Sequence, residues 1–291
     1  MSDEMRPKPL FYVVLLLAVA GLAAYGFRNV LFPRATGGGA ANISPQELQT
    51  SSGAEAADAN APTTVKEYSF KPSEKLPPIQ ETSAYQPPAN RTIKFALNVW
   101  AGWAPIILWN EGADPKKEWA APGGQPFKVE LVLIDNPVAM RDAYAAGKVH
   151  IGWATLDMLP LFMDELKKDP RIMPRIFQQV DFSNGGDGIV IRRSAAKDPK
   201  RPNVSDLRGK KVVLAQNSPS EYFVLNALVN GGVQPSEVQF IYTEDAFQAA
   251  AAFNSDKSLA ACVSWAPDIY NLSKLPENHL LVSTLTANKL I

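Results

Sequence analysis

Cysteine and histidine are nearly absent from this sequence. Cys262 is the only cysteine among 291 residues, so the chain can form neither an internal disulfide nor a cysteine-rich metal cluster. Its neighbours Ala261 and Val263 belong to a predicted strand, which favours core packing of the thiol. His150 and His279 are the only histidines, and His150 starts a buried strand, where a structural role is expected. We therefore predict no metal site and no cofactor.

Net charge and catalytic motifs are also missing. The 29 basic residues balance 29 acidic ones, so no basic face is indicated and nucleic acid is not expected as a partner. The chain contains no Gly-x-Ser-x-Gly elbow, Walker loop, Gly-x-Gly-x-x-Gly fingerprint or His-Glu-x-x-His helix. We therefore expect a protein that is not an enzyme.

One long apolar run stands near the N-terminus. Leu10 to Phe27 are 18 residues without a charge, which is just long enough to span a bilayer. We predict a cytoplasmic segment over 1–9 and an uncleaved inner-membrane anchor over 10–32, with the folded domain in the periplasm or another extracytoplasmic space. A cleaved signal peptide stays open as an alternative, because Ala18-Val19-Ala20 and Leu22-Ala23-Ala24 suit a cleavage site. Basic residues are equally frequent on both sides of the run and leave its orientation unspecified.

Residues 33–90 are predicted to be a linker. Alanine, serine, threonine, glycine and proline dominate this stretch, and such a composition cannot bury a core. Fully stretched, it would reach well over ~100 Å at about 3.3 Å per residue. The folded part, over residues 91–291, could therefore lie away from the membrane.

Strands alternate with helices throughout the folded part. The same order of strand and helix recurs in both halves, which predicts parallel sheets covered by helices on both faces. The predicted fold class is α/β with two similar lobes, lobe 1 over about 91–188 and lobe 2 over about 193–291. The glycine-rich stretch Asn184–Gly188 between them suits a hinge. The predicted strands are 93–99, 127–134, 149–153, 189–192, 211–215, 238–242 and 259–265, and the predicted helices include 137–146, 219–230 and 246–253.

The segment around Ser218 organises the second lobe. A short apolar strand ends at Ala215, and Ser218 then suits the N-cap of a helix, with Pro219 at its first position and Glu221 completing a capping box. A helix that starts where a parallel strand ends directs free N–H groups into the crevice above the sheet, where open α/β sheets bind ligands. The alternative is that Ser218 and Glu221 only cap the helix.

Aromatic and small polar side chains gather at the predicted strand ends. Recognition sites combine apolar walls with a few placed polar groups, so this mixture indicates a ligand pocket between the lobes. For each tryptophan, core packing is the alternative, and helix capping accounts for most aspartates near strand ends. The residues expected to face the crevice are Trp100, Trp103, Trp153, Thr155, Asn184, Asp187, Ser218, Ser220, Tyr222 and Trp265.

Several short motifs resemble a known family. From Thr92 to Ile291 the chain resembles the type 2 periplasmic substrate-binding proteins of ABC importers, in the nitrate, sulfonate, taurine and thiamine-precursor branch. The motifs that carry the resemblance are Trp103-Ala104-Pro105, Ile151-Gly152-Trp153, Asp206-Leu207-Arg208-Gly209-Lys210-Lys211-Val212, Gln216-Asn217-Ser218-Pro219-Ser220, Asp245-Ala246-Phe247 and Ser264-Trp265-Ala266-Pro267.

The resemblance implies that the lobes close on a ligand. The residues it places in the cleft are Trp103, Trp153, Asn184, Ser218, Ser220, Asp245 and Trp265. Glu221 departs from the family pattern: facing the cleft, its charge would favour a cation, whereas as a capping partner it leaves an anionic ligand open. The chain also ends at Ile291 before the return that completes the first lobe in this family, so either the chain is a fragment or another segment completes that lobe.

The expected function is that of a membrane-tethered, extracytoplasmic solute-binding protein. It would capture a small polar solute and present it to an ABC permease, and removing Trp153 or Trp265 would weaken binding without unfolding the domain. The alternative is a cell-envelope sensor or structural component that uses the fold for protein contacts, including a form fused to a peptidoglycan-binding domain similar to that of OmpA. An enzyme of thiamine-precursor synthesis is disfavoured because that activity uses a cysteine-rich motif. The solute and its charge stay open.

Overall fold

The computed structural model describes residues 63–65, 67–84 and 86–287. All of these residues belong to one compact unit of the chain. The predicted anchor Leu10–Phe27 lies outside the described residues. Within the part that is described, no helix is long and apolar enough to cross a membrane.

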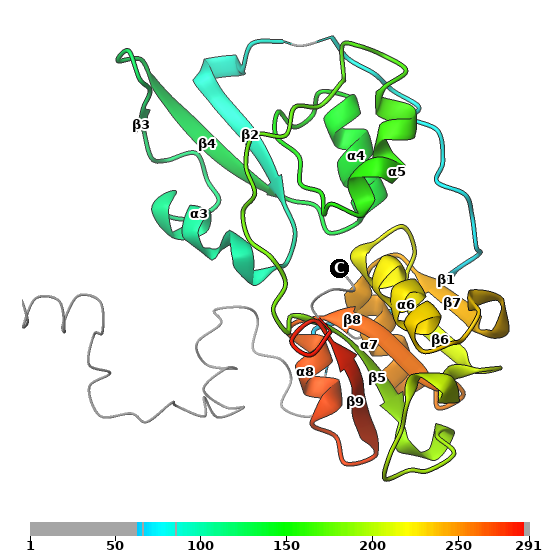
Figure 1. The fold of residues 1–291 in the computed structure, drawn as a ribbon. Helices are drawn as coiled ribbons and strands as arrows, with labels where there is room; N and C mark the ends of the chain where they lie inside the picture. The colour runs from blue at the N-terminus through cyan, green and yellow to red at the C-terminus, as the bar shows by residue number, and fades with distance from the viewer. Residues whose placement is uncertain (1–62, 66, 85, 288–291) are drawn as a thin grey trace, which may run out of the picture. The chain divides into compact units, whose positions relative to one another are not determined.

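Lobe 1, taken here as residues 86–182, is built on a small sheet with two parallel strands at its centre (Figure 1). Ile151 adds one parallel bridge to Phe95, whereas the sequence predicts a full strand over 149–153. Apolar residues of β2 and β4 pack on helices α4 and α5 to form one core. The elements are β2 (Thr92–Leu97), α3 (Ala104–Trp109), β3 (Trp119–Ala120), β4 (Pro126–Leu133), α4 (Pro137–Ala145) and α5 (Met158–Leu166), with 3₁₀ turns at Ala89–Arg91 and Ala101–Trp103.

Lobe 2, residues 183–287, contains five strands of a six-stranded mixed sheet in the order β1-β7-β6-β8-β5-β9, and the edge strand β1 comes from residues 70–71. The central strand β6 is parallel to β7 and β8, while β5 runs antiparallel to β8 and β9. The elements are β1 (Phe70–Lys71), β5 (Asp187–Arg192), β6 (Lys211–Ala215), α6 (Pro219–Asn230), β7 (Gln239–Thr243), α7 (Ala246–Ser255), β8 (Ala261–Trp265), α8 (Asp268–Ser273) and β9 (Asn278–Ser283), with 3₁₀ turns at Arg193–Ala195, Val204–Leu207 and Pro235–Glu237.

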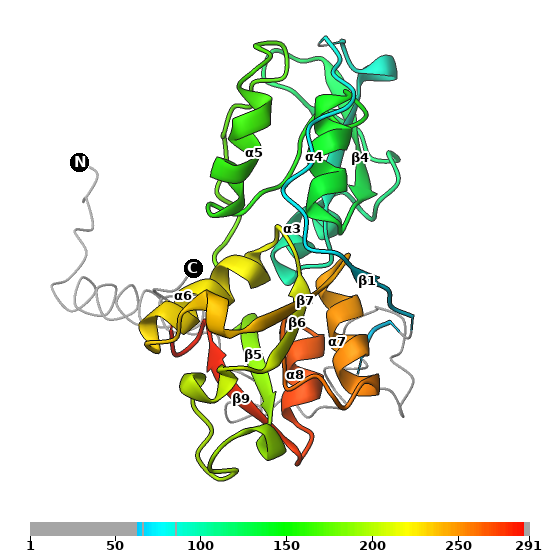
Figure 2. The ribbon, with the colours of Figure 1, turned by 90° about the vertical axis from the view of Figure 1, so that its right-hand side faces the viewer.

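The continuous apolar run of β6 is explained by helices on both faces of the sheet (Figure 2). Successive side chains of a strand point to opposite faces. Val212 and Leu214 therefore pack in the core that contains α6, while Val213 packs in the core that contains α7 and α8. Cys262 belongs to this second core and is fully buried, which confirms the packing role, and burial raises the pKa of its thiol. His150 is structural as well, since its Nδ1 accepts the N–H of Lys94 at 2.9 Å.

The structure differs from the predicted linker over residues 67–84, which we call the strap. Its β1 residues pair antiparallel with β7 at the edge of the lobe 2 sheet. Further along, Leu76 and Ile79 pack against the core of lobe 1, and the N–H of Ser83 donates to the carbonyl of Ala145 at 2.9 Å. The strap therefore contacts both lobes. It has little periodic pattern because it follows surfaces that other elements provide.

Candidate functional site

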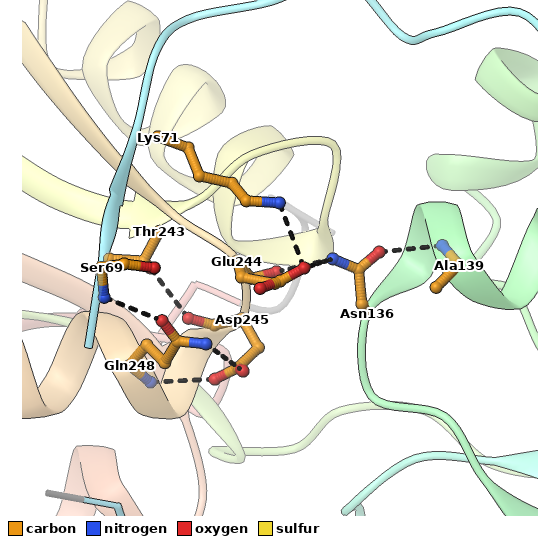
Figure 3. Close-up of polar contacts among 8 residues, drawn as sticks. All are labelled: Ser69, Lys71, Asn136, Ala139, Thr243, Glu244, Asp245 and Gln248. Atoms are coloured by element: carbon orange, nitrogen blue, oxygen red, sulfur yellow. Dashed lines mark hydrogen bonds and ion pairs between the residues drawn. The ribbon is translucent and has the colours of Figure 1, made fainter. Parts of the chain in front are cut away.

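The loops at the carboxyl ends of the strands meet at the boundary between the lobes. The indole N–H of Trp265, at the end of β8, donates to the carbonyl of Val99, which follows β2, at 3.1 Å. The Asn136 side chain, which follows β4 and caps α4, donates to the carbonyl of Glu244 at 3.2 Å (Figure 3). These contacts bring the carboxyl ends of β2 and β4 in lobe 1 close to those of β7 and β8 in lobe 2. A ligand crevice at these strand ends stays a prediction.

Three of the predicted tryptophans are packed inside the protein. Trp103, Trp153 and Trp265 expose 8%, 6% and 2% of their surface, and all belong to hydrophobic cores. Their indole N–H groups donate to the Asn98 side chain at 2.7 Å, to the Ile134 carbonyl at 3.1 Å and, for Trp265, to Val99. Protein groups thus accept all three indole N–H groups, which agrees with the core-packing alternative. Contact of these three tryptophans with a ligand stays a prediction.

Trp100 is placed differently. Its indole N–H donates to Oδ2 of Asp181 at 2.7 Å, and its ring lies so close to Gly186 that a Cβ there would overlap it. The ring also packs against the core residues Phe247 and Trp265 of lobe 2. Trp100 therefore joins lobe 1 to the segment that crosses between the lobes. Gly186 belongs to the predicted hinge, and the close approach of this ring requires a glycine there.

The start of helix α6 differs from the predicted capping box. The Ser218 hydroxyl donates back to the Ala215 carbonyl at 2.7 Å, and its oxygen accepts no hydrogen bond from the helix N–H groups. The Glu221 carboxylate accepts the N–H of Asn217 at 2.7 Å and the Tyr242 hydroxyl at 3.1 Å. Burial and this carboxylate raise the pKa of Tyr242. Glu221 thus orders the turn before the helix, which agrees with its structural alternative, while Tyr222 beside it is exposed.

A stability measurement can test whether the hydroxyl of Ser220 is free to contact a ligand. Its Oγ is buried and has no hydrogen-bond partner within the described part of the chain. An unpaired buried hydroxyl destabilises a fold. Ser220→Ala is therefore expected to raise the free energy of unfolding by up to about 1 kcal/mol, whereas Ser218→Ala should lower it by about 1 kcal/mol because a hydrogen bond is lost. Urea denaturation of both variants checks this, and a loss of stability in Ser220→Ala would show a hidden partner.

The crossing segment holds a buried carboxyl group. The hydroxyl of Ser183 donates to Oδ2 of Asp187, and the Thr284 Oγ1 lies 2.8 Å from Ser183 Oγ. Thr284 accepts the N–H of Gly185 at 2.8 Å. Burial raises the pKa of Asp187 to about 6, opposed by the Ser183 hydrogen bond and assisted by the charges of Asp157 and Asp181. The predicted hinge residue Asn184 is exposed.

The remaining predicted polar residues fall into two groups. Asp245 caps α7 by accepting the N–H groups of Phe247 at 2.9 Å and Gln248 at 2.8 Å, which is a structural role. Figure 3 shows the contact with Gln248. By contrast, Thr155 Oγ1 and Asp157 Oδ1 are buried and lack hydrogen-bond partners among residues 63–65, 67–84 and 86–287. Burial raises the pKa of Asp157. Thr155 lowers the pKa of Asp157 in turn, so the two side chains lie close to one another.

Asp181 and Asp268 are boundary residues that the sequence did not single out as ligand groups. Asp268 is fully buried and accepts the backbone N–H of Thr64 at 2.9 Å and its hydroxyl at 3.0 Å. Burial raises the pKa of Asp268 to about 6. In the sequence, the position of Asp268 shortly after Trp265 indicated only a helix cap. Asp181 lies in a stretch without regular structure, so neither residue could be identified as a ligand group from the sequence.

The boundary carries unneutralised negative charge. Six aspartates lie on its loops and helix starts, and within the described part of the chain none of them forms an ion pair shorter than 4.0 Å. No group of three or more histidine, cysteine, aspartate or glutamate residues that could hold a metal occurs among the described residues. The six are Asp135, Asp157, Asp181, Asp187, Asp245 and Asp268.

Comparisons with known proteins give structural likenesses alone. No family model and no curated protein matches the chain. The aliphatic sulphonate binding protein SsuA from Escherichia coli is 18% identical with a TM-score of 0.46, over 68% of this chain and 62% of that one. The alkanesulfonate-binding protein SsuA from Xanthomonas axonopodis pv. citri bound to MOPS is 17% identical with a TM-score of 0.48, over 66% and 61%. The periplasmic nitrate-binding protein NrtA from Synechocystis PCC 6803 is 16% identical with a TM-score of 0.48, over 67% and 51%.

This chain spans between 51% and 62% of the lengths of these three proteins.

Proposed function

We propose that this protein is a membrane-tethered, extracytoplasmic solute-binding protein that takes a small polar solute between its two lobes and presents it to an ABC permease. The observation that carries the proposal is the meeting of strand ends from two separately cored α/β lobes, through Trp265 with Val99 and Asn136 with Glu244. Ligands of open α/β sheets bind at such ends. Leu10–Phe27 would hold the protein at the inner membrane.

The charge at the boundary favours a cationic solute over a sulfonate or nitrate. The six boundary aspartates have no ion-pair partner among the described residues, and an excess of negative charge attracts ligands of the opposite sign. Asp157 adds an unpaired buried oxygen, and Trp100 an aromatic ring that is only partly buried. Trp100 donates its indole N–H to Asp181, and a carboxylate beside an aromatic ring is a suitable setting for an ammonium group.

A thermal-unfolding screen of the full chain tests this function. A quaternary ammonium ion, a primary amine, nitrate, methanesulfonate and phosphate would each be added. A ligand at a hundredfold its dissociation constant adds about 2.7 kcal/mol of stability, which raises the midpoint by several degrees. We expect the midpoint to rise with the quaternary ammonium ion or the primary amine, and not with nitrate, methanesulfonate or phosphate. Asp157→Asn should abolish it, while Asp164→Asn, on the exposed face of the same helix, should keep it.

An envelope component that binds another protein is the second candidate. The segment that leads from α5 to β5 exposes Ile176, Phe177 and Phe182 by at least 70% each, and such side chains could contact another protein. A screen without any shift, on a protein that is folded by circular dichroism, would favour this candidate over solute binding. A shift with an anion alone would retain solute binding and contradict the cationic class.

A further inference from the structure

The strap provides a second connection between the lobes, in addition to the segment that leads from α5 to β5. On the lobe 2 side, Glu74 is fixed by Gln216 through two reciprocal hydrogen bonds. The N–H of Glu74 donates to Oε1 of Gln216 at 3.2 Å, and Nε2 of Gln216 donates to the Glu74 carbonyl at 2.8 Å. Before this point, Phe70 and Lys71 pair with β7. The strap is therefore attached to lobe 2 through Glu74.

On the lobe 1 side, the attachment begins two residues later. Leu76 packs against the core of lobe 1, and the carbonyl of Pro77 accepts from Nη2 of the buried Arg141 at 2.8 Å. Lys75 alone lies between the two attachments, and it is exposed. Consecutive Cα atoms are 3.8 Å apart, so Glu74 and Leu76 can separate by at most about 7 Å. The strap has no slack to let the lobes part.

The other crossing has the same construction. Asp181 accepts the indole N–H of Trp100, whose ring packs against the cores of both lobes, and Ser183 is held to lobe 2 by Thr284. Phe182 alone lies between these attachments, and 75% of its surface is exposed. In this arrangement the bending point lies at Phe182, before the glycine-rich stretch. The sequence predicted the hinge within that stretch. Two tight crossings define a line about which the lobes can turn.

One carboxylate joins the strap to both lobes. Glu244 follows β7, and its Oε1 accepts from Nζ of Lys71 in the strap at 3.1 Å and lies 3.4 Å from Nδ2 of Asn136 in lobe 1 (Figure 3). Ser69 adds a backbone hydrogen bond to the side chain of Gln248 at 3.1 Å. The strap therefore lies beside the contact through which the lobes meet.

We propose that the strap is the second hinge strand of this domain. With Glu74 and Leu76 both attached, the lobes turn about the line through Lys75 and Phe182 and do not move apart, and Glu244 holds the strap where the lobes meet. This goes beyond solute binding and needs no ligand for its test. It also makes the segment on the N-terminal side of the domain a part of the hinge.

The test measures the distance between the lobes in the full 291-residue chain. Spin labels on Lys167→Cys in lobe 1 and Lys257→Cys in lobe 2 give the distance distribution by pulsed electron resonance. Cys262 is fully buried and stays unlabelled. Four Gly/Ser residues inserted between Lys75 and Leu76 add up to about 13 Å of slack. We expect the distribution to broaden and extend by several ångström.

Two controls keep the test decisive. The same insertion between the exposed Gly123 and Gly124, at a turn within lobe 1, should leave the distribution unchanged. Gln216→Ala, which releases Glu74 without changing the chain length, should broaden it as well, whereas Asn230→Ala, which removes an amide contact within α6 alone, should not. An unchanged distribution in both strap variants, or equal broadening by the Gly123 insertion, would overturn the proposal.

Discussion

Replacing Trp153 by alanine is expected to lower the free energy of unfolding by about 3–5 kcal/mol, the usual cost of removing a large buried aromatic side chain. The ring lies in the core of lobe 1 together with Met140 and Phe162, and its N–H donates to the carbonyl of Ile134. Alanine would leave both a cavity and an unpaired carbonyl. Urea denaturation followed by far-UV circular dichroism measures the change.

This result would revise the expectation that a missing Trp153 weakens ligand binding without unfolding the domain. A loss of 3–5 kcal/mol is a large part of the total stability of a typical domain. Trp109→Ala is the matched control, since 65% of that side chain is exposed, and its cost should stay below about 1 kcal/mol. Equal, small costs for both variants, with weaker ligand binding in Trp153→Ala alone, would restore Trp153 as a ligand residue.

Several elements of both lobes, but not α5, α8 or β9, could be predicted because their signals are local. The apolar run of β6 and the capping residues Asn136 and Asp245 mark strands and helix starts within a few residues of sequence. The strand predicted over 149–153 failed as a full strand, since Ile151 alone bridges to Phe95. Strand length depends on a partner, which short-range patterns do not specify.

The strap could not be predicted, for a related reason. Its strand is two residues long, and its other attachments are single side chains such as Leu76 packing on a surface built by distant segments. The directions of the tryptophan side chains were equally hidden. A tryptophan at a strand end can point into the crevice or into the core, and here Trp153 and Trp265 find carbonyl partners on elements far away in sequence.

Asp187→Asn is expected to raise the free energy of unfolding by up to about 3 kcal/mol at pH 7 to 8. Burial raises the pKa of Asp187 from 3.8 to about 6, and the charged groups that act on it, Asp157 and Asp181, are both negative. Below about pH 4 the carboxyl group is protonated in the folded and unfolded states alike. As the pH rises, the unfolded chain loses this proton first, so the folded state becomes less stable until the pH passes 6.

Asparagine stays neutral at every pH and still offers an oxygen to the hydroxyl of Ser183. The gain in Asp187→Asn should therefore appear above pH 6 and vanish near pH 4, in urea denaturation measured across this range. Asp164→Asn, an exposed carboxylate paired with Lys167, should show no gain that grows with pH. A gain in Asp187→Asn that is the same at pH 4 and pH 8 would mean that packing, and not desolvation of the charge, accounts for it.

The same variant connects stability to the proposed cationic solute. At neutral pH the fold carries an ionised, buried Asp187 that makes it less stable, and a cation bound at the boundary would offset part of that cost by its attraction to the carboxylate. Asp187→Asn should therefore be more stable than the parent without ligand, yet gain less when the cation is added. A variant that gains as much as the parent would place the solute away from the crossing segment.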